Sequence, residues 1–393
     1  MKNGHPSAAA ADKASSLALF SYASSVTITP ICLVELSALF SLSLSQGSSI
    51  EAVRSLFIVV TLTGSTFIAA LLGKMRSLGI GAVVMGAGLL LYASAPAYGA
   101  VLFASVLVGA GGGLLEALIN PLVQEMHPDN SGPSLNVVNA FFSAGVFVTV
   151  LLGGELLTRG VSWRALLAAV GGLAVFTGAV FLFLRRRGGK EQKKSMLQVL
   201  SHKKEILLHR RFPLFAAMMF LAGGTEGALT FWSASYIRIH FGTLARMGGI
   251  ATACFAGGML IGRFAGGRFV PQRRIRLLIA VSALTGLAAA AAVPLTRGLV
   301  PFLLLLFTAG LSVACFWPSI QSYAADRIES DHTSLFILLS LAGIPGFGAV
   351  PWIMGMIGDR YGLRAGFFIL PVLFLLLLIL LLIERKSAEA SPV

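Results

Sequence analysis

Long apolar runs separated by short polar breaks dominate the chain. A bilayer core about 30 Å thick needs roughly 20 apolar residues to be crossed by one α-helix, and each run reaches about that length. The pattern therefore predicts twelve transmembrane helices. They are expected at residues 17–43, 51–73, 78–95, 97–124, 132–157, 164–184, 212–237, 246–267, 275–293, 299–323, 333–356 and 364–383.

One polar connection is longer than the others and strongly basic. It predicts a six-helix bundle at 1–184, a linker at 185–211 and a second six-helix bundle at 212–393. Cationic loops resist translocation, so we expect the linker and both termini in the cytoplasm. Binding of anionic lipid headgroups is a second explanation of the basic cluster. Its members are Arg185, Arg186, Arg187, Lys190, Lys193, Lys194, Lys203, Lys204, Arg210 and Arg211.

The two halves also echo each other in sequence. The motif around Pro121 recurs around Pro318, a displacement of 318 − 121 = 197 residues. Two glycines of the second span recur in the eighth at a displacement of 194, as Gly64 with Gly258 and Gly73 with Gly267. Similar displacements at similar depth favour two six-helix halves related by duplication, an arrangement typical of transporters.

Composition places this chain in a membrane and excludes several functions. Its 393 residues are 56% hydrophobic and 12% charged, with a mean hydropathy of +0.86. The net charge of +14 is spread between apolar runs, which argues against nucleic-acid binding. We find no metal-ligand spacing, no nucleophile with a base and no phosphate-binding loop, so we expect no enzyme, no cofactor and no metal. We predict a monomeric, multi-pass protein of the cell inner membrane that contacts membrane lipids.

Three carboxylates fall inside predicted spans, at Glu35, Glu116 and Glu226. An ionisable side chain in a transmembrane helix costs at least about 2.5 kcal/mol, so each one needs a partner, a cavity or a function. Burial can raise the pKa of a carboxyl by up to ~3–5 units, so Glu35 and Glu116 are candidates to exchange protons near neutral pH. Other acids fall at span ends, where capping or interfacial solvation explains them: Glu155, Asp326 and Asp359.

A polar stripe surrounds the second of these acids. Glu116, Asn120 and Gln124 are spaced i, i+4, i+8 and share one helix face. Pro121 cannot donate a backbone hydrogen bond, so it is expected to kink the helix and free the carbonyl of Ala117.

The fifth span carries a second stripe, because Asn136, Asn139 and Ser143 are spaced i, i+3, i+7. Two such helices predict a common wet cavity. The alternative is that these side chains form hydrogen bonds that hold helices together. In the tenth span Pro318 is expected to free the carbonyl of Ala314.

Aromatic and amide side chains of the second half are candidates for a sugar site. Aromatic rings stack on the C–H face of a hexose, while amides bind its hydroxyl groups. The candidates are Trp232, Tyr236, Trp317 and Gln321, with Trp352 as a further ring. Packing or an interfacial position is the alternative for each ring. Arg263 is interpreted as a snorkelling or interhelical charge.

Two stretches of the chain are similar to a known family. Glu116 to Pro121 followed by Ser134 to Gly145 resembles the fourth and fifth helices of the fucose permease branch of the major facilitator superfamily. The resemblance implies the major facilitator fold and proton-coupled sugar symport. It implies that Glu35 and Glu116 carry the protons and that Asn139 stands where the branch has a sugar-binding glutamine. The segment from Gly223 to Gly227, which contains Glu226, resembles the seventh helix of related members.

The sequence thus favours a proton-coupled symporter of a monosaccharide or similar small polar solute, working by rocking of two bundles. A proton-driven exporter of drugs or organic solutes with the same fold is the alternative. A third hypothesis is a membrane sensor or scaffold that transports nothing.

Overall fold

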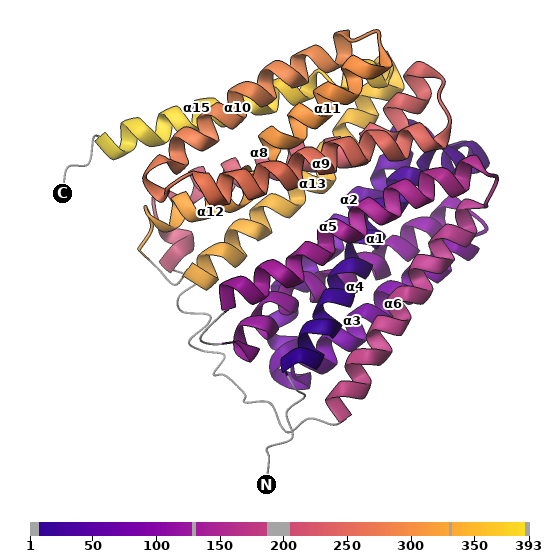
Figure 1. The fold of residues 1–393 in the computed structure, drawn as a ribbon, viewed down its shortest axis with the longest axis horizontal. Helices are drawn as coiled ribbons and strands as arrows, with labels where there is room; N and C mark the ends of the chain where they lie inside the picture. Colours follow the sequence, from indigo (N-terminus) through magenta and orange to yellow (C-terminus); the bar gives the residue numbers. More distant parts are fainter. Residues whose placement is uncertain (1–7, 128–130, 187–204, 330–331, 390–393) are drawn as a thin grey trace. The chain divides into compact units, whose positions relative to one another are not determined.

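A computed structural model describes residues 8–127, 131–186, 205–329 and 332–389, and these residues are almost entirely helical (Figure 1). The helices are α1 (Ala8–Phe40), α2 (Leu44–Leu72), α3 (Lys74–Ser94), α4 (Tyr98–Met126), α5 (Ser131–Thr158), α6 (Trp163–Arg186), α8 (Phe212–Phe241), α9 (Ala245–Phe269), α10 (Ile275–Ala292), α11 (Leu299–Val313), α12 (Phe316–Ala325), α13 (His332–Tyr361), α14 (Leu363–Gly366) and α15 (Ile369–Glu389). Two short 3₁₀ helices, η1 (Gln272–Arg274) and η2 (Val293–Leu295), flank α10.

Twelve spans within the described residues are long and apolar enough to cross a membrane, which confirms the predicted all-helical architecture. The α11 and α12 helices form one span, and α14 and α15 form another. The ends differ from prediction by up to eight residues: the first span begins at Ala9 instead of 17, and the second at Leu44 instead of 51. These starts carry serines and charges, so an apolar pattern places them too late.

The chain divides into two compact units. Unit 1 comprises Met1–Leu42 and Ser49–Met196, and unit 2 comprises Ser43–Ser48 and Leu197–Val393. The first turn of α2 therefore belongs to unit 2 and the rest of that helix to unit 1. Most of the predicted linker, residues 187–204, lies outside the described residues. The scheme of a bundle, a cytoplasmic linker and a second bundle stays a prediction.

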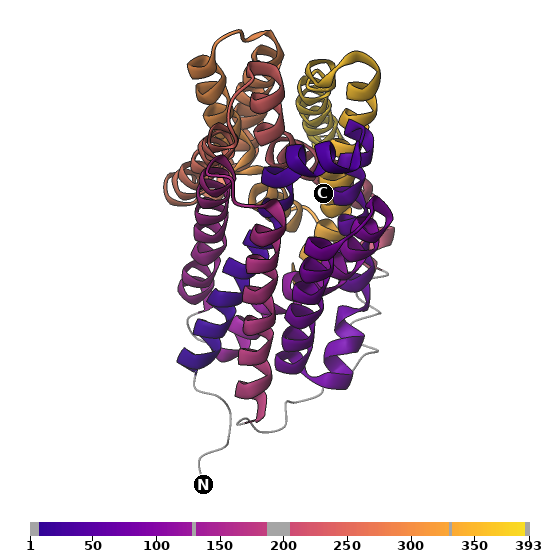
Figure 2. The same cartoon turned by 90° about the vertical axis from the view of Figure 1, so that its right-hand side faces the viewer.

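Each unit is assembled around one helix that contacts several others. In unit 1 this helix is α1, drawn in indigo in Figure 2. It contacts α4, α5 and α6, and 83% of the residues in its most apolar stretch are buried. In unit 2, α8 contacts α9, α11, α12, α13 and α15. Lipid tails are as apolar as leucine, so helices in a membrane gain little from burying apolar surface against each other and depend on close packing. Small residues at helix crossings are therefore decisive.

Glycines create the closest crossings, at equivalent places in the two units. A Cβ added to Gly109 of α4 would stand 2.3 Å from the carbonyl oxygen of Arg54 on α2. One added to Gly310 of α11 would stand 2.1 Å from the carbonyl oxygen of Phe255 on α9. The two pairs are displaced by 310 − 109 = 201 and 255 − 54 = 201 residues. Any larger residue would force these backbones apart.

A second pair of crossings shows the same relation. A Cβ on Gly145 of α5 would lie 2.5 Å from the carbonyl oxygen of Phe20 on α1, and one on Gly346 of α13 would lie 2.1 Å from that of Phe220 on α8. Their displacements are 346 − 145 = 201 and 220 − 20 = 200.

An arginine in each unit repeats the pattern. Arg164 of α6 donates hydrogen bonds to carbonyls at the end of α3, at 2.7 and 3.0 Å, and Arg364 of α14 donates to the Pro294 carbonyl of η2, which follows α10. A cation suits a helix C-terminus because free carbonyls concentrate there. These contacts place equivalent residues 200 or 201 apart, so the sequence matches at 194 and 197 are a few residues out of register. Pro121 and Pro318 are not equivalent positions.

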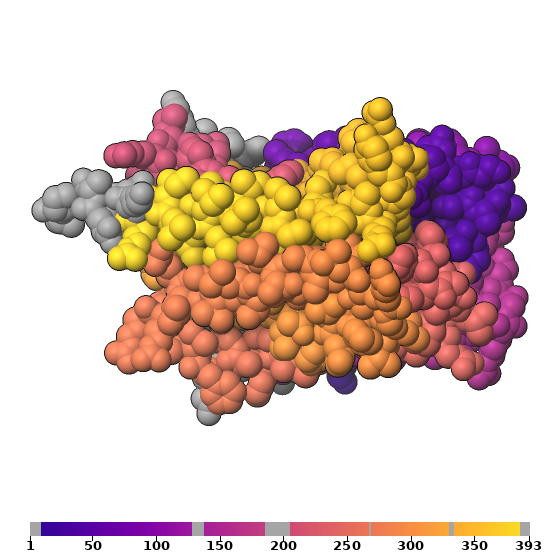
Figure 3. Space-filling model, turned by 90° about the horizontal axis from the view of Figure 1, so that it is seen from above, coloured from indigo at the N-terminus to yellow at the C-terminus, as the bar shows by residue number. Residues whose placement is uncertain are grey.

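The outer face of unit 2 is apolar where α10, α11 and α15 lie side by side. Figure 3 shows this face, with α15 in yellow beside the orange helices. Such a surface suits contact with lipid tails. Its exposed side chains include Leu277, Val281, Leu284, Val300, Leu304, Val372, Leu375, Leu376, Ile379 and Leu382.

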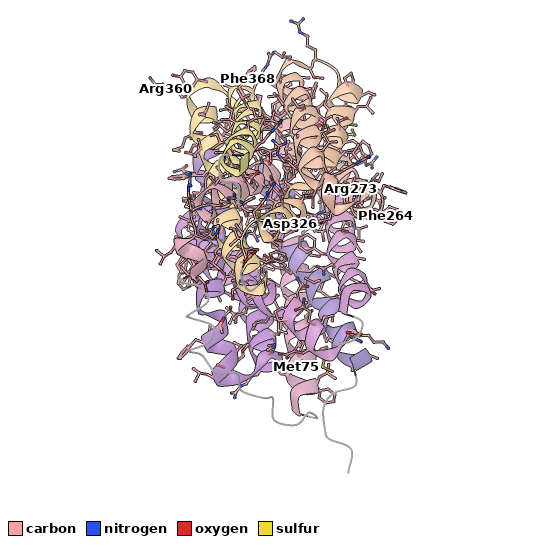
Figure 4. The ribbon with its side chains drawn as sticks, turned by 90° about the vertical axis from the view of Figure 1, so that its left-hand side faces the viewer. Met75, Phe264, Arg273, Asp326, Arg360 and Phe368 are labelled. Carbon is pink, nitrogen blue, oxygen red and sulfur yellow. The ribbon has the colours of Figure 1, made fainter. Side chains whose placement is uncertain are left out.

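The acids at span ends have polar partners. Glu155 accepts a hydrogen bond from Arg159 at 2.7 Å, and Asp326, labelled in Figure 4, accepts one from Gln272 at 2.8 Å. Asp359, near the end of α13, caps a helix other than its own. Its two carboxylate oxygens accept hydrogen bonds from the backbone N–H groups of Leu44 (2.6 Å) and Ser45 (3.0 Å) at the start of α2.

Removing this cap is expected to destabilise the protein. Helix α2 leaves its first N–H groups without intrahelical partners, and Asp359 satisfies two of them with a charge that also suits a helix N-terminus. We expect Asp359→Ala to lower the free energy of unfolding by about 1 kcal/mol and Asp359→Asn to have a smaller effect. Thermal unfolding in detergent, followed by tryptophan fluorescence, measures the difference. Asp326→Ala is the control, and equal stability of the two alanine variants would contradict the capping role.

Candidate functional site

Unit 1 presents the predicted polar stripe of α4 on one face. Glu116, Asn120 and Gln124 are all exposed, as expected from their spacing. The side-chain amide of Asn139 on α5 donates a hydrogen bond to the side-chain oxygen of Asn120 at 3.2 Å. The stripes of α4 and α5 therefore meet. Asn136 lies on α5, but its side chain is outside the described part of the structure.

A buried ion pair lies on α2 in the same unit, where the sequence predicts none. Glu51 and Arg54 are 2% and 6% exposed. The Arg54 guanidinium donates hydrogen bonds to both oxygens of the Glu51 carboxylate, with Nε 2.9 Å from Oε2. The hydroxyl of Ser55 adds a bond of 3.3 Å to Glu51. The predicted span begins at residue 51, so the sequence pattern places Glu51 at its first position. The helix begins at Leu44, which puts the pair two turns inside it.

This pair belongs to a larger group that reaches the polar stripe. Tyr22 of α1 is 6% exposed, and its side chain is hydrogen-bonded to the Glu116 carboxyl. Arg54 interacts electrostatically with both Tyr22 and Glu116. We call Tyr22, Glu51, Arg54 and Glu116 the Glu116 cluster. It joins an exposed acid to a buried charge pair through three helices.

Glu35 does not belong to this cluster. It is half-buried on α1, thirteen residues after Tyr22. At 1.5 Å per residue this is about 20 Å of helix, so Glu35 and Glu116 lie at different depths in the unit. The two acids that the sequence assigns to proton coupling are not neighbours.

The acid of unit 2 is paired as well. Arg263 of α9 contacts Glu226 of α8, with Nη2 3.3 Å from Oε1. Its Nε also donates to the carbonyl of Ala314, at 3.4 Å, where α11 ends and before α12 begins. Pro318 follows four residues later, so the predicted free carbonyl is present and Arg263 binds it. In unit 1, by contrast, α4 continues through Pro121 as one helix.

The amide candidate of unit 2 repeats the contact of unit 1. Gln321 of α12 donates a hydrogen bond to the Ser340 hydroxyl of α13 at 3.1 Å. It is displaced by 321 − 120 = 201 residues from Asn120, and Ser340 by 340 − 139 = 201 from Asn139. A side-chain hydrogen bond therefore joins equivalent positions in both units, but its direction differs: Asn120 accepts the bond in unit 1, whereas its counterpart Gln321 donates it in unit 2.

Trp317 lies one turn before Gln321 on α12 and is half-buried. A Cβ on Gly343 would meet its ring at 2.6 Å, so the ring edge rests on α13. In the 201-residue register Trp317 is the counterpart of Glu116, since 317 − 116 = 201.

Two aromatic candidates are corrected by the structure. Trp232 is fully buried, and its indole N–H donates to the carbonyl of Pro351 at 2.9 Å. Tyr236 is 1% exposed, with its ring stacked between neighbours that include Phe302, at a centroid distance of 5.2 Å. Both ring faces are covered by protein and cannot stack on a solute. Apolar position in a span does not reveal which helix face a ring occupies. Trp352, the further ring, is 40% exposed.

Among the described residues, no group of three or more His, Cys, Asp or Glu side chains is arranged to hold a metal ion. The polar side chains of the candidate site are exposed amides and carboxyls with different partners. Such groups bind polar solutes and exchange protons.

Comparison with known proteins identifies the family. The model of the Major Facilitator Superfamily matches residues 14–335. The chain belongs to this superfamily of transporters. Membrane protein MosC of Rhizobium meliloti is 28% identical over 297 residues, which are 74% of this chain and 70% of MosC.

Solved structures share the major facilitator fold along nearly the whole chain. A bacterial homologue of the human lysosomal transporter Spinster, in an inward-facing and unoccupied conformation, has a TM-score of 0.83 at 14% identity, covering 98% of this chain and 99% of its own. The nucleoside transporter NupG has a TM-score of 0.77 at 12% identity, covering 96% and 99%. A D-xylose-proton symporter has 0.75 at 12% identity, covering 95% and 96%.

Breaking the charge pair of unit 2 is expected to be costly. Arg263→Ala leaves a largely buried carboxylate and a backbone carbonyl without their donor, so we expect a loss of about 1–3 kcal/mol in unfolding free energy. Arg263→Ala with Glu226→Gln removes the unpaired charge and is expected to recover most of the loss. Thermal unfolding of the two variants tests the pairing. A double variant as unstable as Arg263→Ala would show that Glu226 is not the partner that matters.

Proposed function

We propose that this major facilitator protein is a proton-coupled symporter of a monosaccharide or a similar small polar solute, and that its two six-helix bundles rock to give alternating access. The observation that carries the proposal is the Glu116 cluster, together with the amides beside it. An acid in a membrane helix is energetically costly, so its presence there indicates a function. Here it stands one turn from Asn120, which Asn139 contacts at 3.2 Å.

Glu116 is the main proton carrier in this proposal. It is exposed, so a proton can reach it, and Tyr22 and Arg54 give its ionised form a hydrogen-bond donor and a nearby positive charge. Glu35 is proposed as a second proton site at another depth of α1. Because about 20 Å of helix separates Glu35 from Tyr22, the two acids act independently.

The solute is proposed to bind the amides of the two units. Unit 1 offers Asn120, Gln124, Asn139 and, from the sequence, Asn136. Unit 2 offers Glu226, Trp317 and Gln321. The resemblance of α4 and α5 to the fucose permease branch supports a sugar, as does the fold shared with a D-xylose-proton symporter.

We further propose an inner-membrane location with both termini in the cytoplasm, and a monomeric state. Loops rich in lysine and arginine stay on the cytoplasmic side of the membrane, and the basic linker is proposed to lie there. The proposal assigns to that side Lys74 and Arg76, at the start of α3, and Arg273, Arg274 and Arg276, around the start of α10.

Uptake into proteoliposomes with an imposed pH gradient tests the function. We expect one or more monosaccharides to enter with protons, so that adding sugar makes the outside more alkaline. Glu116→Gln cannot exchange a proton and is expected to abolish this pH change. Glu35→Gln is expected to alter the pH dependence of uptake while leaving the fold intact.

The results also separate the alternatives. Efflux of hydrophobic cations without any response to sugars would overturn symport and favour the proton-driven exporter. Sugar uptake with an unchanged pH response in Glu116→Gln would remove Glu116 from coupling. Unchanged uptake and pH dependence in Glu35→Gln would do the same for Glu35.

Asn139→Ala is expected to weaken solute binding. The substitution removes an amide that binds the solute, together with the hydrogen bond that it donates to the Asn120 oxygen. We therefore expect a loss of about 1–3 kcal/mol, or roughly 5–150-fold in Kd. Isothermal titration of the purified protein with the transported sugar measures it. Val137→Ala is the matched control, because Val137 is an exposed side chain (62%) on the same helix outside the polar stripe. An unaltered Kd for Asn139→Ala would remove this residue from the site.

A further inference from the structure

The Glu51–Arg54 pair is unusual because it does not fasten one helix to another. Both residues lie on α2, one turn apart. Such an i, i+3 pair stabilises a helix by only ~0.2–0.5 kcal/mol. Placing each charge in a membrane costs at least about 2.5 kcal/mol on insertion scales. Helix stability therefore does not account for the pair, and its interactions with residues of α1 and α4 offer an explanation.

Close packing fixes those neighbours. The Arg54 carbonyl lies against Gly109 of α4, and Glu116 follows two turns later on that helix. The Tyr22 ring lies against Gly112, where an added Cβ would stand 3.0 Å from the ring atom Cε2. Glycines thus bring α1 and α2 onto the segment of α4 that carries Glu116. A cluster held this way keeps its charges at constant separations.

The charges of the cluster do not balance when Glu116 is ionised. Glu51 and Arg54 cancel, whereas Glu116 adds one negative charge that comes and goes with its proton. Arg54 is a positive group that interacts electrostatically with Glu116, and Tyr22 supplies a hydrogen bond. On the fifth helix, the described neighbour Asn139 is uncharged.

We propose that Arg54 and Glu51 are positioning residues for Glu116: Arg54 stabilises the Glu116 carboxylate after its proton leaves, and Glu51 holds Arg54 and limits that stabilisation. The inference rests on the proposed role of Glu116 as proton carrier. It adds a control on the pH at which the carrier loads and unloads. Without Glu51, the full charge of Arg54 would act on Glu116 and keep it ionised.

The protonation of Glu116 can be followed without any substrate. Infrared spectroscopy of the purified full-length protein, titrated from alkaline to acidic pH, detects the carbonyl stretch of a protonated carboxyl. The part of this band that is lost in Glu116→Gln belongs to Glu116. Its midpoint is the quantity to compare between variants.

Two variants of the pair are expected to move the midpoint in opposite directions. Glu51→Gln removes a negative charge beside Arg54 and is expected to lower the midpoint by about one pH unit or more. The double variant Glu51→Gln with Arg54→Gln keeps the size of both side chains but removes both charges, and its midpoint is expected above that of the wild type. Tyr22→Phe loses a donor to the carboxylate and is also expected to raise the midpoint.

The controls separate a local effect from a general one. Glu155→Gln removes an acid from the i, i+4 pair with Arg159 at a span end of the same unit and is expected to leave the midpoint unchanged. A midpoint that does not fall in Glu51→Gln, or does not rise in the double variant, overturns the proposal. Where Glu51→Gln does not fold, the double variant alone decides, because it buries no unpaired charge.

Failure of this inference differs from failure of the proposed function. If proteoliposomes take up no sugar, the infrared midpoints still show whether Arg54 and Glu51 act on Glu116. If uptake depends on Glu116 but the midpoints do not respond, symport stands and the positioning role falls.

Discussion

A charge inside hydrocarbon has no water to solvate it, so the protein itself must supply its partner. Charge pairings of this kind lie within single units among the described residues, two of them inside spans and a third where two spans end. They are Glu51 with Arg54, Glu226 with Arg263, and Glu384 with Tyr323 and Arg327. The last two require helices to meet at a particular rotation, because a partner on the wrong face leaves a charge unpaired, whereas the Glu51–Arg54 pair forms within α2. Glycines make these meetings possible by letting backbones approach within van der Waals contact.

The two units use one helical frame for different chemistry. Crossings, arginine caps and the amide hydrogen bond between consecutive spans recur 200 or 201 residues apart. The charge pairs do not recur. Arg54 has Phe255 as its counterpart, and both offer the same backbone carbonyl to a glycine. Packing constrains the backbone at this position and leaves the side chain free, so the halves keep their shape while their side chains diverge.

Sequence predicts well whatever depends on local periodicity. Apolar length gave twelve spans, and i, i+4 spacing placed Glu116, Asn120 and Gln124 on one exposed face. Prediction failed where a contact depends on a distant helix. The buried faces of Trp232 and Tyr236 are set by packing, which an apolar run does not encode. The Glu51–Arg54 pair was missed because the polar start of α2 hid its boundary, and the repeat register needed contacts between helices.

The amide contact gives the register that relates the two candidate sites. Asn120 and Gln321 are each hydrogen-bonded to the equivalent position of the next helix, Asn120 as acceptor and Gln321 as donor. One turn before each stands a different residue: Glu116 in unit 1 and Trp317 in unit 2. An acid exchanges protons, and a ring offers an apolar face for a sugar. Under the proposed function, the same position serves proton exchange on α4 and stacking on the solute on α12. A polar solute and a proton then need not compete for the same group.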